Sequence, residues 1–122
     1  MKYDYKKQLL SFKYAWQGIR ACVGYEQNLD FHLIVMMLVI IAGVVFGINR
    51  MEWVAVVLCF GLVIGAELLN SSIERLTDIA SPEWLPLAGK VKDIAAGAVL
   101  VTAIASATVG LIIFVPYISA LF

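Results

Sequence analysis

The sequence predicts an all-α integral membrane protein with three transmembrane helices and one N-terminal amphipathic surface helix. Of its 122 residues, 62% are hydrophobic and only 15% are charged, which is too apolar for a soluble domain of this size. Three apolar stretches each approach or exceed the roughly 18–20 residues that cross about 30 Å of hydrocarbon. The chain has room for one domain, residues 1–122. Its formal net charge of zero argues against a nucleic-acid partner.

Residues 1–25 have the pattern of an amphipathic helix. Their apolar side chains recur every three or four positions and fall within an arc of roughly 80° on a helix: Tyr5, Leu9, Phe12, Trp16, Ile19 and Val23. Lysines occupy much of the remaining surface, which is typical of a helix in the membrane interface. Such a helix is either an anchor alone or also the wall of a site. With no apolar core and cleavage site, we expect this stretch to belong to the mature protein.

The three transmembrane helices are predicted at residues 31–48, 53–74 and 94–118. The first two are separated by so few residues that they form a tight antiparallel hairpin. Eight of the nine basic residues fall on one side of this arrangement, and only Arg50 falls on the other. The positive-inside rule therefore places the N-terminus in the cytosol. In the second loop, Ser81-Pro82-Glu83 is typical of a helix start, so we expect a short helical turn there.

Polar residues continue the second span in the stretch AELLNSSIERLTD. Glu67, Asn70, Glu74 and Asp78 are three, four and four residues apart, so they share one face of a helix with Ser71. Glu67 lies roughly 10 Å deeper in the membrane than Glu74. Ionisable groups at such depth are costly and usually functional, although interhelical hydrogen bonding is an alternative role. Because stacked carboxylates repel one another, we expect them to recruit a divalent cation such as Mg²⁺.

Lys92 and Asp93 begin the third span, level with the outer acids of this face if the helices are antiparallel. A lysine beside metal-binding acids suits a nucleotide phosphate, whereas alone it would be a snorkelling lysine. Glu26 adds an acid at the entrance of the first span. Neither a GxxxxGK[ST] loop nor the protein-kinase motifs are present, so phosphate chemistry would need another kind of site. We interpret His32, the sole histidine, as a hydrogen-bonded interfacial residue rather than a catalytic one.

The stretch AELLNSSIERLTD, followed by KD and IAAGAVL, resembles the prokaryotic diacylglycerol kinase and undecaprenol kinase family of small membrane lipid kinases. The resemblance extends from about Phe12 to Pro116 and includes AWQGIRA in the surface helix. It implies a homotrimer with active sites shared between neighbouring subunits, in the bacterial cytoplasmic membrane. It also implies that ATP, with Mg²⁺, phosphorylates the hydroxyl of a membrane lipid.

The resemblance also implies roles for individual residues. Glu67 would be the general base for the lipid hydroxyl, and Asn70 would help to position that hydroxyl. Glu26 and Glu74 would bind the metal. The nucleotide and its phosphates would contact a larger set: Tyr14, Glu26, Glu74, Asp78, Lys92 and Asp93. Lys7 stands where the family can carry an arginine, and Asp30 replaces the arginine of the E-x-N-x-R-x-H pattern in EQNLDFH.

The resemblance of EQNLDFH and LPLAGKVKDIAAGAVL to the undecaprenol kinase branch makes undecaprenol the expected acceptor. Diacylglycerol is the alternative acceptor. From another class, a small proton-coupled transporter would also carry a membrane glutamate, but near the bilayer midplane. A structural membrane subunit without chemistry is the third reading. The acidic face instead extends to the membrane surface beside a lysine, which favours the kinase interpretation.

Overall fold

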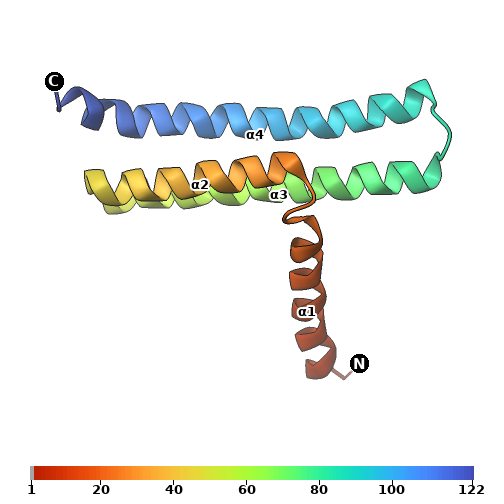
Figure 1. Cartoon of the computed structure of the whole chain (residues 1–122). Helices are drawn as coiled ribbons and strands as arrows, with labels where there is room; N and C mark the ends of the chain where they lie inside the picture. Colours follow the sequence, from red (N-terminus) through yellow and green to blue (C-terminus); the bar gives the residue numbers. More distant parts are fainter. Residues whose placement is uncertain (1) are drawn as a thin grey trace.

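The protein folds into a bundle of three long antiparallel helices from which a fourth helix projects (Figure 1). The structure is a computed structural model and describes residues 2–122. It consists of α1 (Tyr5–Cys22), α2 (Gln27–Phe46), α3 (Arg50–Ala80) and α4 (Pro86–Ser119). The last three are long and apolar enough to cross a membrane, and residues 2–122 contain no strand. The predicted all-α membrane fold is thereby confirmed.

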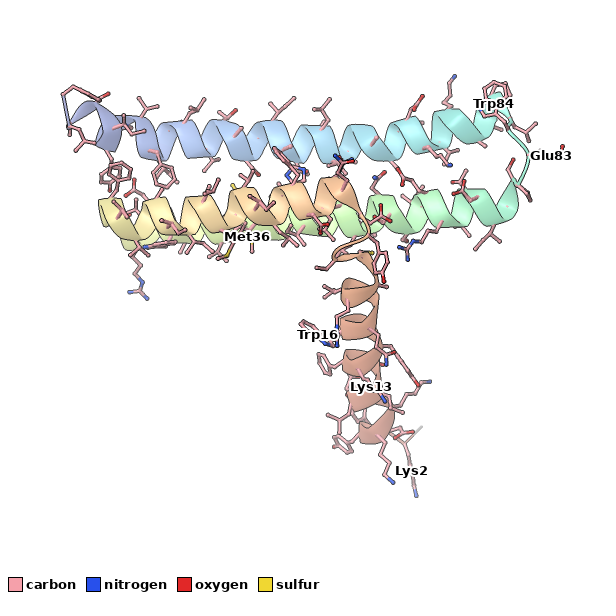
Figure 2. The ribbon with its side chains drawn as sticks, in the orientation of Figure 1. Lys2, Lys13, Trp16, Met36, Glu83 and Trp84 are labelled. Carbon is pink, nitrogen blue, oxygen red and sulfur yellow. The ribbon has the colours of Figure 1, made fainter. Side chains whose placement is uncertain are left out.

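Helix α1 leaves the bundle at a steep angle and packs little against it (Figure 1). The Asp4 side chain caps its first turn by accepting hydrogen bonds from the amides of Lys6 and Lys7, at 3.1 and 3.2 Å. Cys22 is the only buried residue of the helix. Lys13 and Trp16 project freely from it (Figure 2). A separate helix with an exposed apolar stripe is the form expected of an interfacial helix.

A short, fully capped turn joins α2 to α3. Gly47 ends α2 in the left-handed conformation, with φ of 63°. The Asn49 side chain accepts a hydrogen bond from the amide of Glu52 at 2.9 Å, and the Glu52 carboxylate accepts one from the amide of Asn49 at 3.0 Å. The Tyr117 hydroxyl donates to the same carboxylate at 2.5 Å. This contact ties the end of α4 to the turn.

The connection between α3 and α4 is not helical around Pro82. The expected helix start at Ser81-Pro82-Glu83 is wrong, because α4 begins at Pro86. A helix through Pro82 would place Pro86 where its missing N–H removes an i to i−4 hydrogen bond. Instead the Ser81 hydroxyl donates to the Glu83 carbonyl at 2.9 Å. Glu83 and Trp84 lie at the tip of this connection (Figure 2).

Helices α3 and α4 are longer than a membrane is thick. Their 31 and 34 residues correspond to about 46 and 51 Å, against about 30 Å of hydrocarbon. Both extend past the start of α2 on the side where α1 departs (Figure 1). At the opposite end, Ile48, Val56 and Ile113 form a buried cluster. Most other large apolar side chains are exposed, as in helices surrounded by lipid.

Candidate functional site

One face of α3 changes from buried to exposed as the helix approaches its C-terminal end. The Glu67 residue is 2% exposed and Asn70 is 7% exposed. Glu74 is half-buried, and the Asp78 side chain is 66% exposed. The face therefore leads from a carboxylate inside the bundle to a carboxylate in water. Its spacing of three and four residues keeps all four side chains on one side of an unbroken helix.

The buried carboxylate of Glu67 faces the first turns of α2. Nε2 of His32 lies 3.2 Å from Oε1 of Glu67. The two atoms are in contact but lack the alignment of a hydrogen bond, so Oε1 has no hydrogen-bond partner within residues 2–122. Buried polar atoms are rarely left unpaired, and such an atom indicates a role in binding or chemistry. A hydroxyl donor would satisfy it.

Asn70 sits between the buried and the exposed parts of this face. Its Nδ2 donates to Oε1 of Glu74 at 3.4 Å, a long hydrogen bond. Its Oδ1 is buried and has no partner among the described residues. The Asn70 side chain therefore links the buried region around Glu67 to Glu74. Its Oδ1 atom is available to accept a hydrogen bond.

Two further acids lie close enough to Glu67 for their charges to act on it: Glu26 and Glu74. Glu26 precedes α2, and its Oε1 accepts from the Arg75 guanidinium of α3 at 3.3 Å. No three acids, histidines or cysteines in residues 2–122 are grouped tightly enough to enclose a metal ion. Magnesium needs only one or two protein carboxylates when phosphate and water supply its other ligands. The Glu26 and Glu74 carboxylates fit that donor set.

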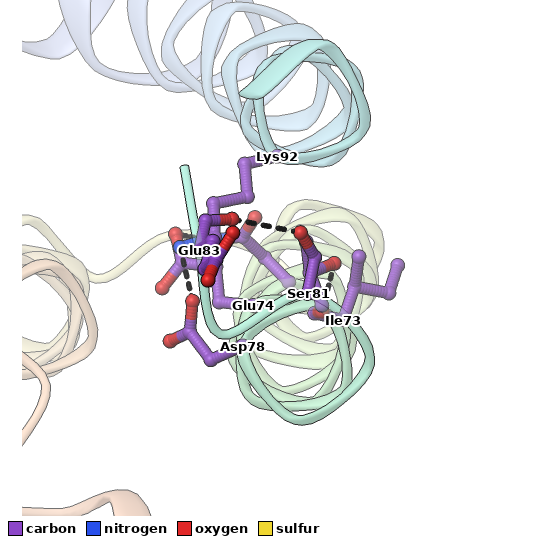
Figure 3. Close-up of polar contacts among 8 residues, drawn as sticks. Ile73, Glu74, Asp78, Ser81, Glu83 and Lys92 are labelled. Atoms are coloured by element: carbon purple, nitrogen blue, oxygen red, sulfur yellow. Dashed lines mark hydrogen bonds and ion pairs between the residues drawn. The ribbon is translucent and has the colours of Figure 1, made fainter. Parts of the chain in front are cut away.

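Lys92 of α4 lies against the exposed end of the acidic face. Its Nζ is 2.5 Å from Oδ1 of Asp78, and Glu74 lies beside this pair (Figure 3). The charge of Glu74 also acts on Lys92. The lysine thus pairs with Asp78 and lies near Glu74, as expected if the helices are antiparallel. Asp93 is exposed and has no hydrogen-bond or ion-pair partner in the part of the chain described.

Tyr14 and Lys7 are not brought to this cluster within one chain. Both are exposed on α1, which projects away from the bundle (Figure 1). The Tyr14 side chain makes no hydrogen bond to any residue from 2 to 122. The expected nucleotide contact of Tyr14 is therefore not formed inside the single chain.

Three residues have contacts that the sequence did not indicate. His32 contacts the buried carboxylate, and Arg75 pairs with Glu26. Asp30, at the position of the missing arginine, accepts a hydrogen bond from the amide of Gly24 at 2.9 Å and so closes the turn before α2. The hairpin places the start of α2 beside residues 67–75 of α3, and this proximity was the available signal for the contacts of His32 and Arg75.

The sequence matches a known protein family and several of its members. Residues 13–114 match the family described as Prokaryotic diacylglycerol kinase. The chain is 39% identical to the undecaprenol kinase of Bacillus subtilis over 106 residues, covering 87% of this chain and 86% of that protein. It is 34% identical to a diacylglycerol kinase of Synechocystis, covering 88% of this chain and 62% of that protein. It is 29% identical to the Escherichia coli K12 diacylglycerol kinase over 75% of each chain. The chain therefore belongs to the prokaryotic diacylglycerol kinase family.

Proposed function

We propose that this protein transfers the γ-phosphoryl group of ATP to the hydroxyl of a membrane lipid, with undecaprenol as the preferred acceptor and undecaprenyl phosphate as the product. The observation that carries the proposal is the unpartnered Oε1 of Glu67, which is buried in a membrane helix. The same face of α3 continues from Glu67 to the exposed Asp78, which contacts Lys92 of α4. At such a boundary between bilayer and water, a lipid hydroxyl can meet a nucleotide phosphate while the lipid stays in the membrane and the nucleotide stays in water.

In the proposed reaction the lipid hydroxyl oxygen attacks the γ-phosphorus, and the bond from that phosphorus to the β–γ bridging oxygen breaks. Glu67 accepts the hydroxyl proton, and ADP leaves with the bridging oxygen. The amide of Asn70 helps to hold the hydroxyl beside Glu67. Phosphoryl transfer depends mainly on positioning and on charge stabilisation, so a carboxylate and an amide suffice at the lipid side.

The outer part of the face supports the nucleotide. Glu26 and Glu74 would hold a Mg²⁺ ion, which neutralises phosphate charge when it is bound. Lys92 provides a further positive charge for a phosphate, while Asp78 holds its ammonium in place. Asp93 and Tyr14 complete the proposed nucleotide contacts. Tyr14 reaches them if α1 of the same chain moves or if a neighbouring subunit supplies it.

The proposed setting is a homotrimer in the bacterial cytoplasmic membrane with the N-terminus in the cytosol. Eight of nine basic residues lie on the side where α1, the α3–α4 connection and Lys92 gather. The positive-inside rule supports the cytosolic assignment of that side, where ATP is available. The incomplete polar contacts of the single chain support active sites completed between subunits.

Diacylglycerol is the alternative acceptor, favoured by relatives named diacylglycerol kinase. The 39% identical relative named undecaprenol kinase favours undecaprenol. A proton-coupled transporter is disfavoured, because the acidic face continues into water beside Lys92 rather than stopping near the midplane.

The test is a phosphorylation assay with purified protein in lipid bilayers, ATP, Mg²⁺ and a panel of lipid alcohols. We expect transfer of labelled phosphate to undecaprenol at a higher kcat/KM than to diacylglycerol. A reversed order would leave the kinase activity standing but overturn the acceptor. Absence of any phosphorylated lipid would overturn the proposal itself.

A further inference from the structure

An apolar cavity of about 410 Å³ lies between α2, α3 and α4. Most of its lining side chains are hydrocarbon, and Met36 from the middle of α2 is one of them (Figure 2). Only His32 and Ser106 bring a nitrogen or a hydroxyl to the wall. In a membrane helix bundle, a space with this lining accepts hydrocarbon and excludes groups that need hydrogen bonds.

The cavity ends about one helical turn short of the buried carboxylate of α3, and Glu67 itself does not line it. Val63 and Ile64 line it one turn before Glu67 and on the same face. His32 belongs both to the wall and to the contact with Glu67. The α3 lining runs from Val56 to Ile64, about 12 Å along the helix. A linear molecule in it would present one end to the carboxylate.

The α4 wall is built mostly from small residues, Ala103, Ser106, Ala107 and Gly110, together with Val109. A Cβ atom added at Gly110 would meet nothing within 4 Å, so this wall leaves open space. Small side chains make the cavity wide enough for a hydrocarbon chain with methyl branches. Its polar end and its wide apolar body together fit a branched alcohol.

We propose that this cavity binds the isoprenoid chain next to the hydroxyl of a polyprenol, with His32 positioning that hydroxyl on Glu67. The proposal rests on the kinase function proposed above and extends it to the origin of acceptor selectivity. A polyprenol has hydrocarbon directly beyond its hydroxyl-bearing carbon. Its chain therefore enters the apolar cavity without burying another polar group.

Diacylglycerol differs from a polyprenol in the atoms next to the hydroxyl, which would enter the cavity first. Its ester groups lie within a few atoms of the hydroxyl and would face Val63 and Ile64, which offer no hydrogen-bond donor. Burying unpaired ester carbonyls lowers affinity. Diacylglycerol would therefore present its hydroxyl to Glu67 with its acyl chains outside the cavity.

The test fills the cavity away from the carboxylate with Gly110→Leu. The pairs Lys92–Asp78 and Tyr117–Glu52 fix the register of α4 against α3. This register places Gly110 about 11 Å along the helix from the level of Glu67. The matched control is Ala105→Leu, an exposed position on the same helix that does not line the cavity. Acceptors are undecaprenol, a five-carbon prenyl alcohol and diacylglycerol.

For Gly110→Leu we expect the KM for undecaprenol to rise roughly tenfold, the scale of steric discrimination in apolar pockets. The kcat/KM for the five-carbon alcohol and for diacylglycerol should stay within twofold of the wild-type values. Ala105→Leu should leave all three unchanged. The retained turnover with the short alcohol shows that the variant is folded.

Three outcomes would overturn the assignment of the cavity. One is an unchanged KM for undecaprenol in Gly110→Leu, and another is an equal loss with all three acceptors. The third is a changed oligomeric state with unaltered undecaprenol kinetics, which would assign the cavity to a helix of a second copy. If wild-type protein phosphorylates no alcohol, the proposed function fails as well, whereas these three outcomes leave it intact.

Discussion

His32 of α2 places its Nε2 atom 3.2 Å from Oε1 of Glu67 of α3, inside the bundle. The contact joins the first membrane helix to the one carboxylate of this face that is fully buried. It also places a polar ring at one end of a largely apolar cavity. The inner end of the acidic face is therefore an interhelical site, and its chemistry depends on the packing of α2 against α3.

Replacing Glu67 with glutamine should abolish lipid phosphorylation and leave nucleotide binding nearly intact. Glutamine keeps the shape of the side chain but cannot accept the hydroxyl proton, and loss of a general base typically lowers kcat by about 10²–10⁴-fold. The measurement is turnover with undecaprenol beside the affinity for an ATP analogue with Mg²⁺. A large loss of nucleotide affinity would assign Glu67 to the nucleotide instead of the lipid.

Replacing Glu74 with glutamine should raise the Mg²⁺ concentration that gives half-maximal activity. Glu74 is a half-buried carboxylate on the metal-facing part of the proposed site, and a neutral amide is a weaker ligand for a hard cation. Glu83→Gln is the matched control, since Glu83 is exposed at the tip of the α3–α4 connection. Identical Mg²⁺ titrations for Glu74→Gln and wild type would remove Glu74 from the metal site.

Replacing Lys92 with methionine should raise the KM for ATP roughly tenfold and leave the melting temperature almost unchanged. The ammonium is proposed to contact phosphate, whereas the ion pair with Asp78 is largely exposed and stabilises the fold little. Lys90→Met changes an exposed lysine two residues nearer the start of α4 and should change neither quantity. A drop in melting temperature without a change in KM would make the pair structural.

The sequence predicted the positions along each helix better than the contacts between helices. Hydrophobic length located all three membrane helices, because a segment in lipid must satisfy its own backbone hydrogen bonds. Helical spacing placed Glu67, Asn70, Glu74 and Asp78 on one face, since those positions depend only on the helix itself. A proline does begin the helix that follows the second loop, but it is Pro86 and not Pro82 as expected.

The contacts made by α2 could not be predicted in the same way. This helix is apolar on nearly all sides, so periodicity does not indicate which face meets α3. The approach of His32 to Glu67, and of Glu26 to Arg75, depends on side-chain packing between the helices. For the same reason the sequence did not reveal the cavity, whose wall combines residues from three helices.

Replacing Gly43 with alanine should destabilise the hairpin between α2 and α3. The added Cβ atom would lie 2.6 Å from Cη2 of the Trp53 ring, so the ring must shift. Overpacking of this kind typically costs about 1–3 kcal/mol in the free energy of unfolding. Gly61→Ala is the control within α3, because its Cβ atom would meet nothing within 4 Å of the chain. The measurement is the unfolding free energy in detergent micelles, and equal effects of the two substitutions would contradict the close packing at Gly43.

Replacing Tyr117 with phenylalanine should lower the stability of the bundle without lowering lipid phosphorylation at moderate temperature. The Tyr117 hydroxyl donates to the Glu52 carboxylate at the end of the bundle opposite Lys92, and a hydrogen bond to a charged group is stronger than one between neutral groups. The ring would still pack against Phe46 and leave the cap of α3 by Asn49 intact. Tyr25→Phe removes a hydroxyl from a side chain that is 83% exposed, so it should leave the unfolding free energy unchanged. Equal unfolding free energies for Tyr117→Phe and Tyr25→Phe would show that the hydroxyl does not tie α4 to the α2–α3 turn.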